Sequence, residues 1–519
     1  MQLNLQHSRV ATANLTQIIL QYNIGVPFVQ EPYTILNKVA GFPKGFKIFT
    51  RRSGRKRSAI IVNNDIDVIA ITQGSHEDAI LTEFIYQGLK FYGASLYIPI
   101  DQDIEWDLGT IEEIIRLTKG EMLLLALDKN ARSKIWSDTY TNARGRALEE
   151  YIITRDLLIM NEDSDVPTFE SSRGRSWIDL TLCNNTLAQK IGRWSCGEEV
   201  SCADHNIIFF EIDSWAHGSK TKHTAKRYNT KAERRGTFAH HLARNLRTNF
   251  DCSDDTSDWT VCDNEISQKI KLYSDTDQVI RKFTSAITAA CDRTFQATRS
   301  GYQAEKKRSV PWWTKDLTLL RKKTLALRRR FQRTKNDDKL RLERRQQYLE
   351  CNRIYQTKLR EEKLQSWKDF CSSIESSNPW NGVYRYAAGK LRSKPILTTL
   401  KTGNNSYTTD MQSTINQMTE HFVPEDSEDC DDAHHKRVRL QVLAPLRTTN
   451  DEKFTRHEVQ VVLEKFDPHK APGEDALSSE ILLHAFRIFP TVFTEIYNVC
   501  LRRGQFPKQW KRSVILPIV

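Results

Sequence analysis

The chain has 519 residues, enough for about three domains of roughly 150 residues, so one compact unit is not expected. Its 77 Lys and Arg against 65 Asp and Glu give a formal net charge of +12, and the isoelectric point is about 9.1. Such a chain attracts polyanions, of which nucleic acid is the commonest and an acidic membrane face the next. It has no secretory signal and no run of 18 apolar residues, so we expect a soluble intracellular protein. Ten cysteines without a CxxC pair predict reduced thiols.

Residues 1–213 are expected to form an α/β domain. Apolar repeats at intervals of three and four predict helices over 108–120 and 147–158. Five mostly apolar segments are typical of buried strands: 58–71, 89–100, 121–128, 176–183 and 206–213. Strands of this kind with helices between them indicate a sandwich whose sheets are covered on the outside. Functional side chains are then expected where strands end.

Residues 214–450 have the pattern of a basic helical connector. The sequence "TKNDDK" predicts a break between two helices, which would form a hairpin. The apolar faces of these helices are marked by Leu317, Leu320, Leu327 and Phe331 in the first and Tyr348, Cys351, Tyr355 and Leu359 in the second. The acidic segment 423–435 is predicted to be a flexible linker, with His434 and His435 in a solvated loop rather than a metal site.

The connector is strongly basic over residues 321–345, where 12 Lys or Arg stand against 3 Asp or Glu. Partners four residues apart cannot neutralise this excess. It is either a solvated face or a tract that binds the nucleic-acid backbone. We favour the second interpretation, and the candidate contacts are Arg321, Lys322, Lys323, Arg328, Arg329 and Arg330.

Residues 451–519 have the pattern of three helices joined by loops. The apolar ending "SVILPIV" predicts a strand without a partner, so we expect the first part of a truncated domain.

Polar side chains interrupt or end several apolar segments of the first region. Burial would cost each of them several kcal/mol without a partner, so we expect them to converge on one site. They are Asn4, Glu31, Tyr97, Asp128, Asn130, Thr168, Asp179, Asp204 and His205.

This composition matches the needs of phosphodiester hydrolysis. A carboxylate such as Glu31 would hold a divalent cation, and Mg²⁺ suits oxygen ligands. Asp128 would orient and deprotonate water, with Asn130 contacting the phosphate. His205, held by Asp179, would donate to phosphate oxygens as charge builds in the transition state.

At these residues the sequence resembles a family. The motifs "LNLQHS", "VQEPY", "SLYIP", "LDKNARSKIW", "TNARG", "PTFES…SWIDLTL" and "ADHN" resemble, in order, the endonuclease domain of jockey-like non-LTR retrotransposons. The resemblance implies a four-layer α/β sandwich of the endonuclease/exonuclease/phosphatase type over 1–213. The connector and "HKAPGEDALSSEIL" resemble the regions that lie after the endonuclease in such polyproteins, so 451–519 would be an incomplete reverse transcriptase fingers region.

The resemblance also implies roles. Asn4 and Glu31 match the first two active-site motifs, Tyr97 lies beside the scissile phosphate and Thr168 lies at the rim of the site. Glu31 and Asp204 are the expected metal ligands, for Mg²⁺ or for Mn²⁺ in its place. The implied partners are target DNA and the element's RNA, with no membrane and no small-molecule cofactor, in the nucleus after a cytoplasmic ribonucleoprotein stage.

Two departures from the family pattern stand out. Ala203 replaces the usual serine before Asp204, which predicts weakened cleavage. The aspartates that bind metal in a polymerase palm have no counterpart in this sequence, so polymerase activity is not expected from it. Two alternatives remain: a phosphoesterase of the same fold acting on a small phosphate ester, and a decayed element remnant that only binds nucleic acid.

Overall fold

In a computed structural model, the apolar segment around residue 125 forms strand β10 (Leu123–Asp128), and all six of its side chains are buried. Side chains alternate between the two faces of a strand. The odd-numbered leucines join the core beneath the covering helices, whereas Leu124 and Ala126 join a core shared with a second sheet. The alternation therefore places Asp128 between the two sheets.

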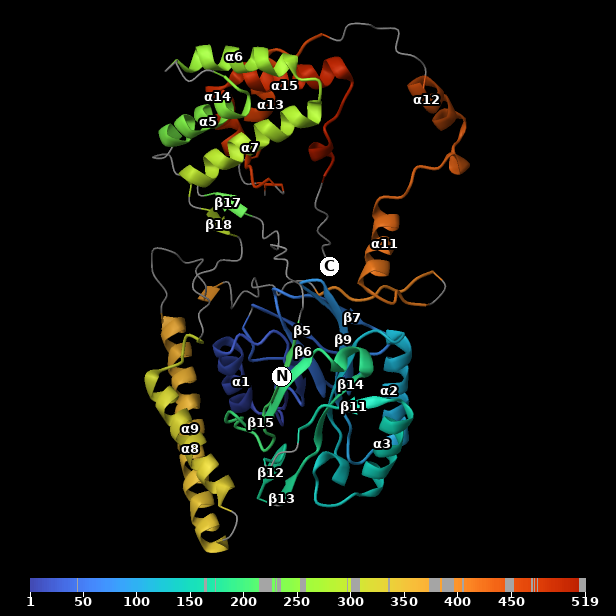
Figure 1. Ribbon diagram of the computed structural model, residues 1–519, viewed down its shortest axis with the longest axis vertical. Helices are drawn as coiled ribbons and strands as arrows, with labels where there is room; N and C mark the ends of the chain where they lie inside the picture. Colours follow the sequence, from blue (N-terminus) through green and yellow to red (C-terminus); the bar gives the residue numbers. More distant parts are fainter. Residues whose placement is uncertain are drawn as a thin grey trace. The chain divides into compact units, whose positions relative to one another are not determined.

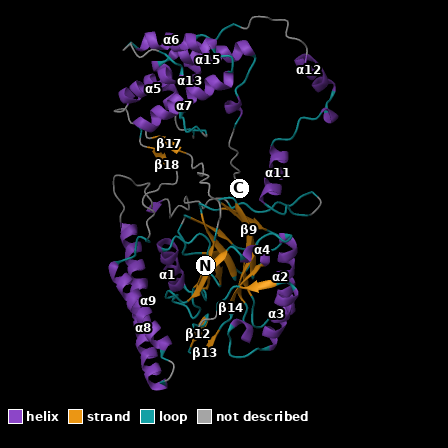
Figure 2. Cartoon of the chain, viewed as in Figure 1, coloured by secondary structure: helices purple, strands orange, loops and turns teal. Residues whose placement is uncertain are grey.

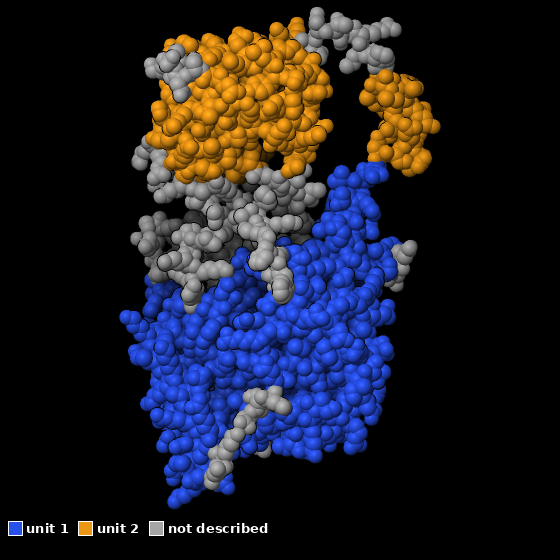
Figure 3. Space-filling view, viewed as in Figure 1, with its two compact units in different colours: residues 1–220, 305–425 blue, residues 221–304, 426–519 orange. Residues whose placement is uncertain are grey.

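The chain forms two compact units (Figure 3). Unit 1 contains residues 1–220 and 305–425, and unit 2 contains residues 221–304 and 426–519. The structure describes residues 1–512 except 44, 163–165, 173, 214–225, 229, 231–234, 253–257, 296, 300–308, 335–336, 373–382, 385–395, 404–405, 444–451, 468–469, 471 and 474. The strand predicted over 513–519 lies outside the described residues.

Unit 1 is built on two six-stranded sheets (Figures 1 and 2). In spatial order, the first sheet contains β15 (Ile191–Cys196), β16 (Ile208–Ile212), β1 (Gln2–Asn4), β2 (Phe28–Gln30), β6 (Ser58–Asn63) and β5 (Phe46–Phe49). The second contains β11 (Leu157–Ile159), β14 (Asp179–Asn184), β10, β9 (Leu89–Tyr97), β8 (Ala79–Tyr86) and β7 (Asp67–Ile71). Two small hairpins are β3 (Thr34–Ile35) with β4 (Lys38–Val39), and β12 (Phe169–Ser171) with β13 (Gly174–Ser176).

Helices cover the outer faces of both sheets. The helical elements of unit 1 are α1 (Arg9–Gln21), α2 (Ile104–Thr118), η1 (Lys134–Trp136), α3 (Ala143–Thr154), α4 (Asn185–Ala188), α8 (Lys315–Arg333), α9 (Asp338–Ser372) and α11 (Met411–Phe422). Helix α1 begins where the Ser8 side chain accepts a hydrogen bond from the Ala11 N–H, and Asp103 caps α2 in the same way. Helices α2 and α3 lie on one side of the sandwich, and α1 lies on the other (Figure 1). The predicted α/β sandwich is confirmed.

The helical hairpin of α8 and α9 belongs to unit 1. Leu317, Tyr355 and Leu359 share a core with α1 and the first sheet. Inside that core, the Tyr355 hydroxyl donates to Asn14 Oδ1 at 2.6 Å. The predicted apolar faces of the hairpin are therefore correct, and their partner is the first sheet with its helix.

A later part of the connector covers an edge of the second sheet. Edge strands expose unpaired backbone groups that must be paired or covered. The Ala70 N–H of β7 donates to Leu397 O at 3.1 Å, and the Thr399 N–H donates to Ala70 O at 2.9 Å. Sequence patterns predicted three consecutive regions, whereas the connector is divided between the two units because these contacts join residues 305–425 to unit 1.

Unit 2 is mainly helical. Its elements are β17 (Lys226–Tyr228), α5 (Arg235–Asn249), α6 (Trp259–Leu272), α7 (Thr276–Thr294), β18 (Ala297–Arg299), η3 (Glu428–Cys430), α12 (Ala433–Leu443), α13 (Arg456–Glu464), α14 (Ser479–Ile488), α15 (Pro490–Arg503) and η4 (Lys508–Lys511). The three helices predicted after residue 451 are present as α13, α14 and α15, and they share one apolar core with α5, α6 and α7. The acidic segment predicted to be a flexible linker contains η3, and His434 and His435 lie at the start of α12 rather than in a loop. Arg439 of α12 pairs with Asp426 and Asp431, which flank η3.

Among the described residues, no disulfide bond joins any of the ten cysteines. Among the described residues, no helix combines the length and apolar character that a membrane crossing requires.

We expect Tyr355→Phe to lower the free energy of unfolding of unit 1 by about 1–2 kcal/mol, because it leaves the buried Asn14 oxygen without this donor. Urea unfolding followed by circular dichroism and by protease resistance of α9 measures the change. Tyr348→Phe, on the same helix but only partly buried, is the matched control. Equal stability of the two variants would contradict the structural role of this hydrogen bond.

Candidate active site

Strand register in the second sheet brings three predicted residues side by side. Asp128 pairs with Tyr97 in the parallel ladder between β10 and β9, and with Asp179 in the antiparallel ladder between β10 and β14. In the first sheet, Asn4 is paired with Gln30, the residue before Glu31. Strand ends from both sheets thus meet at one edge of the sandwich.

Asp179 and His205 form a buried hydrogen-bonded pair. His205 Nδ1 lies 2.9 Å from Asp179 Oδ2 and 3.1 Å from Oδ1. The two residues are 2% and 4% exposed. Thr168 is also buried, and its hydroxyl oxygen accepts a hydrogen bond from the Asp179 N–H at 3.0 Å. This threonine therefore anchors the backbone of the aspartate instead of facing solvent at a rim.

Asp128 is the central carboxylate of the site. Its Oδ2 accepts a hydrogen bond from Asn4 Nδ2 at 2.7 Å and lies 3.9 Å from His205 Nε2. Its Oδ1 is buried and has no hydrogen-bond partner among the described residues. Burial raises the pKa of Asp128 to about 7, and the Asp179 charge adds to the rise while His205 and Asn4 oppose it. A carboxylate with this pKa can take up a proton near neutral pH.

His205 carries the opposite charge at the site. Burial alone lowers its pKa, but the charges of Asp179 and Asp128 outweigh burial and raise the pKa to about 9. The imidazole is therefore protonated at neutral pH, and its Nε2 faces Asp128. Such a group can donate a hydrogen bond to an oxygen that gains negative charge.

Two predicted residues occupy left-handed backbone conformations at this edge. Glu31 has a φ of 43° and Asn130 a φ of 45°. Asparagine tolerates this region, whereas glutamate does so at a cost, and strain of this kind clusters at functional sites. Asn130 Nδ2 donates to Ile98 O at 3.0 Å.

Burial and the charges of Glu31 and Asp128 raise the pKa of Tyr97, so its phenol stays protonated.

Asp204 lies outside the buried cluster. Its side chain is exposed, and Gln6 Nε2 donates to its Oδ2 at 3.4 Å. Ala203, the departure from the family pattern, is partly buried, and its carbonyl accepts a hydrogen bond from the Ser201 hydroxyl at 2.9 Å. A hydroxyl is thus present two residues before the expected serine.

A divalent cation fits the oxygen donors of this site. Asp128, Asp179 and His205 offer ligand atoms within 4.8 Å of one another. However, a protonated histidine does not bind metal, and its Nδ1 is engaged with Asp179. The partnerless Asp128 Oδ1 and the Glu31 carboxylate, whose side chain is 20% exposed, are better placed to face a hydrated hard cation.

Sequence patterns missed a buried lysine beside the site. Lys129 is 0% exposed, its Nζ donates to Trp177 O at 2.7 Å, and it lies 4.4 Å from the centroid of the Trp136 ring. Burial lowers the pKa of Lys129 to about 7, against the opposing charges of Asp179 and Asp128. A lysine between two polar residues has the pattern of an exposed side chain, so no local signal could have revealed it.

Two glutamines between the sheets were also missed. Gln2 Nε2 donates to Leu127 O at 2.9 Å, and Gln30 Nε2 donates to Ala126 O at 3.0 Å. Both are fully buried. They are polar residues in short apolar strands, which is the only signal that the sequence carried. Together with Asn4 they join the first sheet to β10 beneath the site.

The basic residues of α8 divide between two faces. Arg321 and Arg328 are 5% and 2% exposed, so the proposed backbone contact does not fit these two side chains. Arg321 pairs with Glu199 at 3.6 Å. Lys322, Lys323, Arg329 and Arg330 are exposed, and they stay candidates for nucleic-acid contact.

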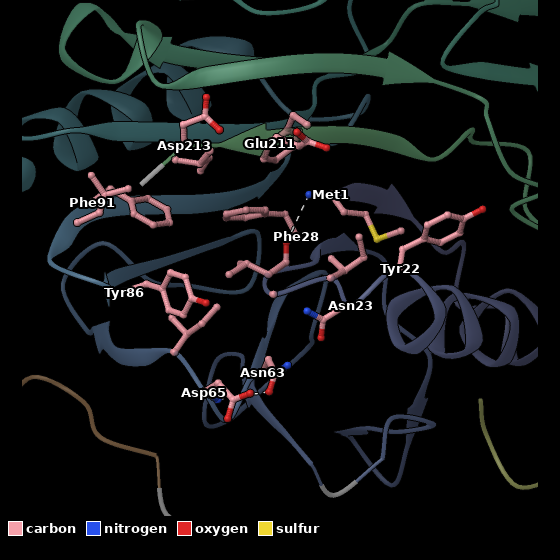
Figure 4. Close-up of a pocket in the computed structure, with 17 residues that line it drawn as sticks. Met1, Tyr22, Asn23, Phe28, Asn63, Asp65, Tyr86, Phe91, Glu211 and Asp213 are labelled. Carbon is pink, nitrogen blue, oxygen red and sulfur yellow. Dashed lines mark hydrogen bonds between the residues drawn. The ribbon is translucent and has the colours of Figure 1, made fainter. Parts of the chain in front are cut away.

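A pocket elsewhere in unit 1 contains none of the predicted site residues. It is lined by Phe28 and Leu89, which begin β2 and β9, whereas the site lies where these strands end. Figure 4 shows its aromatic wall and the acids Asp65, Glu211 and Asp213. It therefore lies at the opposite edge of the sandwich.

Comparisons with known proteins identify one family model and several relatives. Residues 91–209, which include seven of the predicted residues, match a family described as endonuclease-reverse transcriptase. The chain is 24% identical, over 91% of its length, to the Retrovirus-related Pol polyprotein from type-1 retrotransposable element R1 of Bradysia coprophila. It is 23% identical, over 98% of its length, to the Putative 115 kDa protein in type-1 retrotransposable element R1DM of Drosophila melanogaster.

These matches cover 46% and 47% of the two relatives, so the chain spans about half the length of the curated relatives it matches. Among solved structures, the chain is similar to the endonuclease domain of TRAS1, a telomere-specific non-LTR retrotransposon. The two are 28% identical with a TM-score of 0.38, and the match covers 41% of this chain and 97% of that domain. The family match and the two relatives confirm the resemblance to a non-LTR retrotransposon protein that contains an endonuclease.

The raised pKa of His205 predicts a pH dependence of stability. The folded protein holds the His205 proton more tightly than the unfolded chain, whose pKa is about 6.5. This stabilisation is fully present below pH 6.5 and is lost as the pH rises through about 9. We expect the stability advantage of the unsubstituted chain over His205→Gln, measured by urea unfolding in EDTA, to shrink across this window. A constant difference from pH 6 to 9.5 would contradict the raised pKa.

Proposed function

We propose that unit 1 is a divalent-metal-dependent endonuclease that nicks one strand of DNA and leaves a 3′-hydroxyl. The observation that carries the proposal is the buried Asp128 carboxylate, held by Asn4 and facing a His205 that Asp179 orients. A base with a pKa near 7 beside a protonated imidazole can deprotonate water and stabilise the charge that develops on a phosphate oxygen.

The proposal assigns a role to each site residue. Asp128 accepts a proton from the attacking water, and Asn130 contacts the phosphate. His205 Nε2 donates to a phosphate oxygen, and Tyr97 offers its neutral phenol beside the scissile bond. Glu31, with Asp204 as a second candidate, would hold Mg²⁺ or Mn²⁺, which neutralises charge on the phosphate when bound.

The wider role is inferred from the relatives. A 3′-hydroxyl at the nick would prime reverse transcription of the element's RNA in the nucleus, after a cytoplasmic ribonucleoprotein stage. The basic helical connector would take part in binding that RNA. We propose that this chain alone does not polymerise DNA, and a primer-extension assay with an RNA template tests this directly.

We expect Asp128→Asn to lower the rate of nicking supercoiled plasmid about 100-fold or more, because the amide keeps the shape of the side chain but cannot accept the proton. DNA affinity should stay near normal. Asp65→Asn, at the opposite edge of the sandwich, is the matched control. Full activity of Asp128→Asn would remove this residue from the mechanism.

We expect Glu31→Gln to require a higher Mg²⁺ concentration for half-maximal nicking, since one anionic oxygen ligand is lost. A magnesium titration of the full chain measures the shift, and nicking of either protein should stop in EDTA. Nicking that persists in EDTA would refute metal dependence.

We expect Lys322→Gln with Lys323→Gln to weaken DNA binding and to flatten its salt dependence. Each phosphate contact contributes about 0.9 to the slope of log affinity against log salt, so a loss of about 1–2 is expected. Binding titrations between 50 and 200 mM salt measure the slope. An unchanged slope would assign these lysines to a solvated face.

The same assays separate the two alternatives. Hydrolysis of a soluble phosphate ester without nicking would favour a small-molecule phosphoesterase. Salt-sensitive DNA binding by the folded chain without cleavage would favour a decayed remnant, and Ala203→Ser would then be the first variant to examine.

A further inference from the structure

The buried arginine of the connector reaches the loops that hold the candidate active site. Arg328 lies in the middle of α8 and is 2% exposed. Its Nη1 donates to Glu199 O at 3.1 Å, and its Nη2 donates to Asn206 Oδ1 at 2.7 Å. A guanidinium is costly to bury, so it stays there only where its donors are matched by well-placed acceptors.

The approach of α8 to these loops is close. A Cβ atom on Gly197, whose φ is 75°, would lie 2.7 Å from Arg328 Nη2. It would lie equally close, at 2.7 Å, to Val166 Cγ1, so a side chain at this position would crowd the guanidinium and Val166 together. The loop before Glu199 is therefore shaped to accept the arginine.

Asn206 transmits this contact to the active site. It directly follows His205, its N–H donates to Thr168 O at 2.7 Å, and its Nδ2 donates to Pro167 O at 2.6 Å. Because Arg328 donates to the amide oxygen, the amide nitrogen must face Pro167. Arg328 thus fixes the orientation of the Asn206 side chain. That side chain joins the segment 167–169 to the segment that carries His205.

Both members of the His205–Asp179 pair depend on these two segments. Thr168, between Pro167 and Phe169, accepts the hydrogen bond from the Asp179 N–H. Phe169 forms an isolated antiparallel bridge with His205, and their ring centroids lie 4.9 Å apart. A shift of the 167–169 segment would move the imidazole and the carboxylate together.

A second contact comes from α9. Arg345 Nη2 donates to Ser171 O at 2.9 Å, at the end of β12, which begins with Phe169. Helix α9 therefore contacts the β12–β13 hairpin, and helix α8 contacts Asn206.

We propose that Arg328 is a positioning residue that acts through Asn206, so that the connector hairpin of α8 and α9 is part of the catalytic unit. The proposal rests on the proposed nuclease function. It assigns the hairpin a task besides nucleic-acid contact: the buried face aligns the His205–Asp179 pair, while the exposed lysines on the other face stay available to a phosphate backbone.

The test uses the full chain and single-turnover nicking of plasmid with Mg²⁺ at saturating protein. We expect Arg328→Met to lower the saturated rate about tenfold or more, with half-saturation changed less than about twofold, because orientation and not DNA contact is lost. Arg328→Lys, which keeps one donor, should recover part of the rate. Arg333→Met, an exposed arginine of the same helix, should keep the full rate.

A double-mutant cycle separates action through Asn206 from general stabilisation. If Arg328 acts through Asn206, Arg328→Met combined with Asn206→Ser should be no slower than the slower single variant. Additive losses, or a full saturated rate of folded Arg328→Met, would overturn the proposal. Should Arg328→Met fail to fold, Arg328→Lys is compared with Asn206→Ser in the same cycle.

Hydrogen exchange provides a measurement that does not need nuclease activity. The Glu170 and Asn206 N–H groups bond to Asp204 O and Thr168 O, so Arg328→Met should speed exchange in residues 166–170 and 204–207 and leave β10 unchanged. Unchanged exchange there would refute positioning. Failure of the unsubstituted chain to nick DNA would instead refute the proposed function and leave this result standing.

Discussion

A carboxylate buried between two sheets is the constraint on which the rest of unit 1 depends. Asp128 ends a strand whose other side chains are apolar, and an uncompensated charge at that depth would cost several kcal/mol. Asn4 and the His205 imidazolium supply the compensation, and Asp179 in turn supplies the charge that keeps His205 protonated. The arrangement is stable only while both sheets and the loop carrying His205 keep their places.

The glutamines between the sheets serve that requirement. The side chains of Gln2 and Gln30 donate hydrogen bonds to carbonyl groups of β10, so they fix the position of the first sheet relative to Asp128. The hairpin of α8 and α9 acts on the other side, since it packs against α1 and reaches Asn206 beside His205. Helical periodicity places Arg321 and Arg328 on the buried face of α8 and the six other cations of this helix on its exposed face.

Much of the site was predictable from the sequence because its signals are local. Carboxylates at the ends of apolar strands, such as Asp128 and Asp179, stand out from their apolar neighbours. Predictions failed where the partner is distant in sequence. Arg328 resembles its neighbours Arg329 and Arg330, and only the fold distinguishes the one that is buried. Lys129 looks solvated between two polar residues, yet the Trp177 carbonyl and the Trp136 ring enclose it.

The sequence by itself determined the α/β character, the helical hairpin with its apolar faces, and most of the polar residues that meet at one edge of the sandwich. These arise from periodicities of two and 3.6 residues and from side-chain type, which act over a few residues. Only the tertiary structure decided which surface the hairpin covers, how the connector divides between two units, and that Asp128 stands opposite Tyr97 and Asp179. Such pairings depend on sheet register and on packing between segments up to 341 residues apart, and no local pattern encodes them.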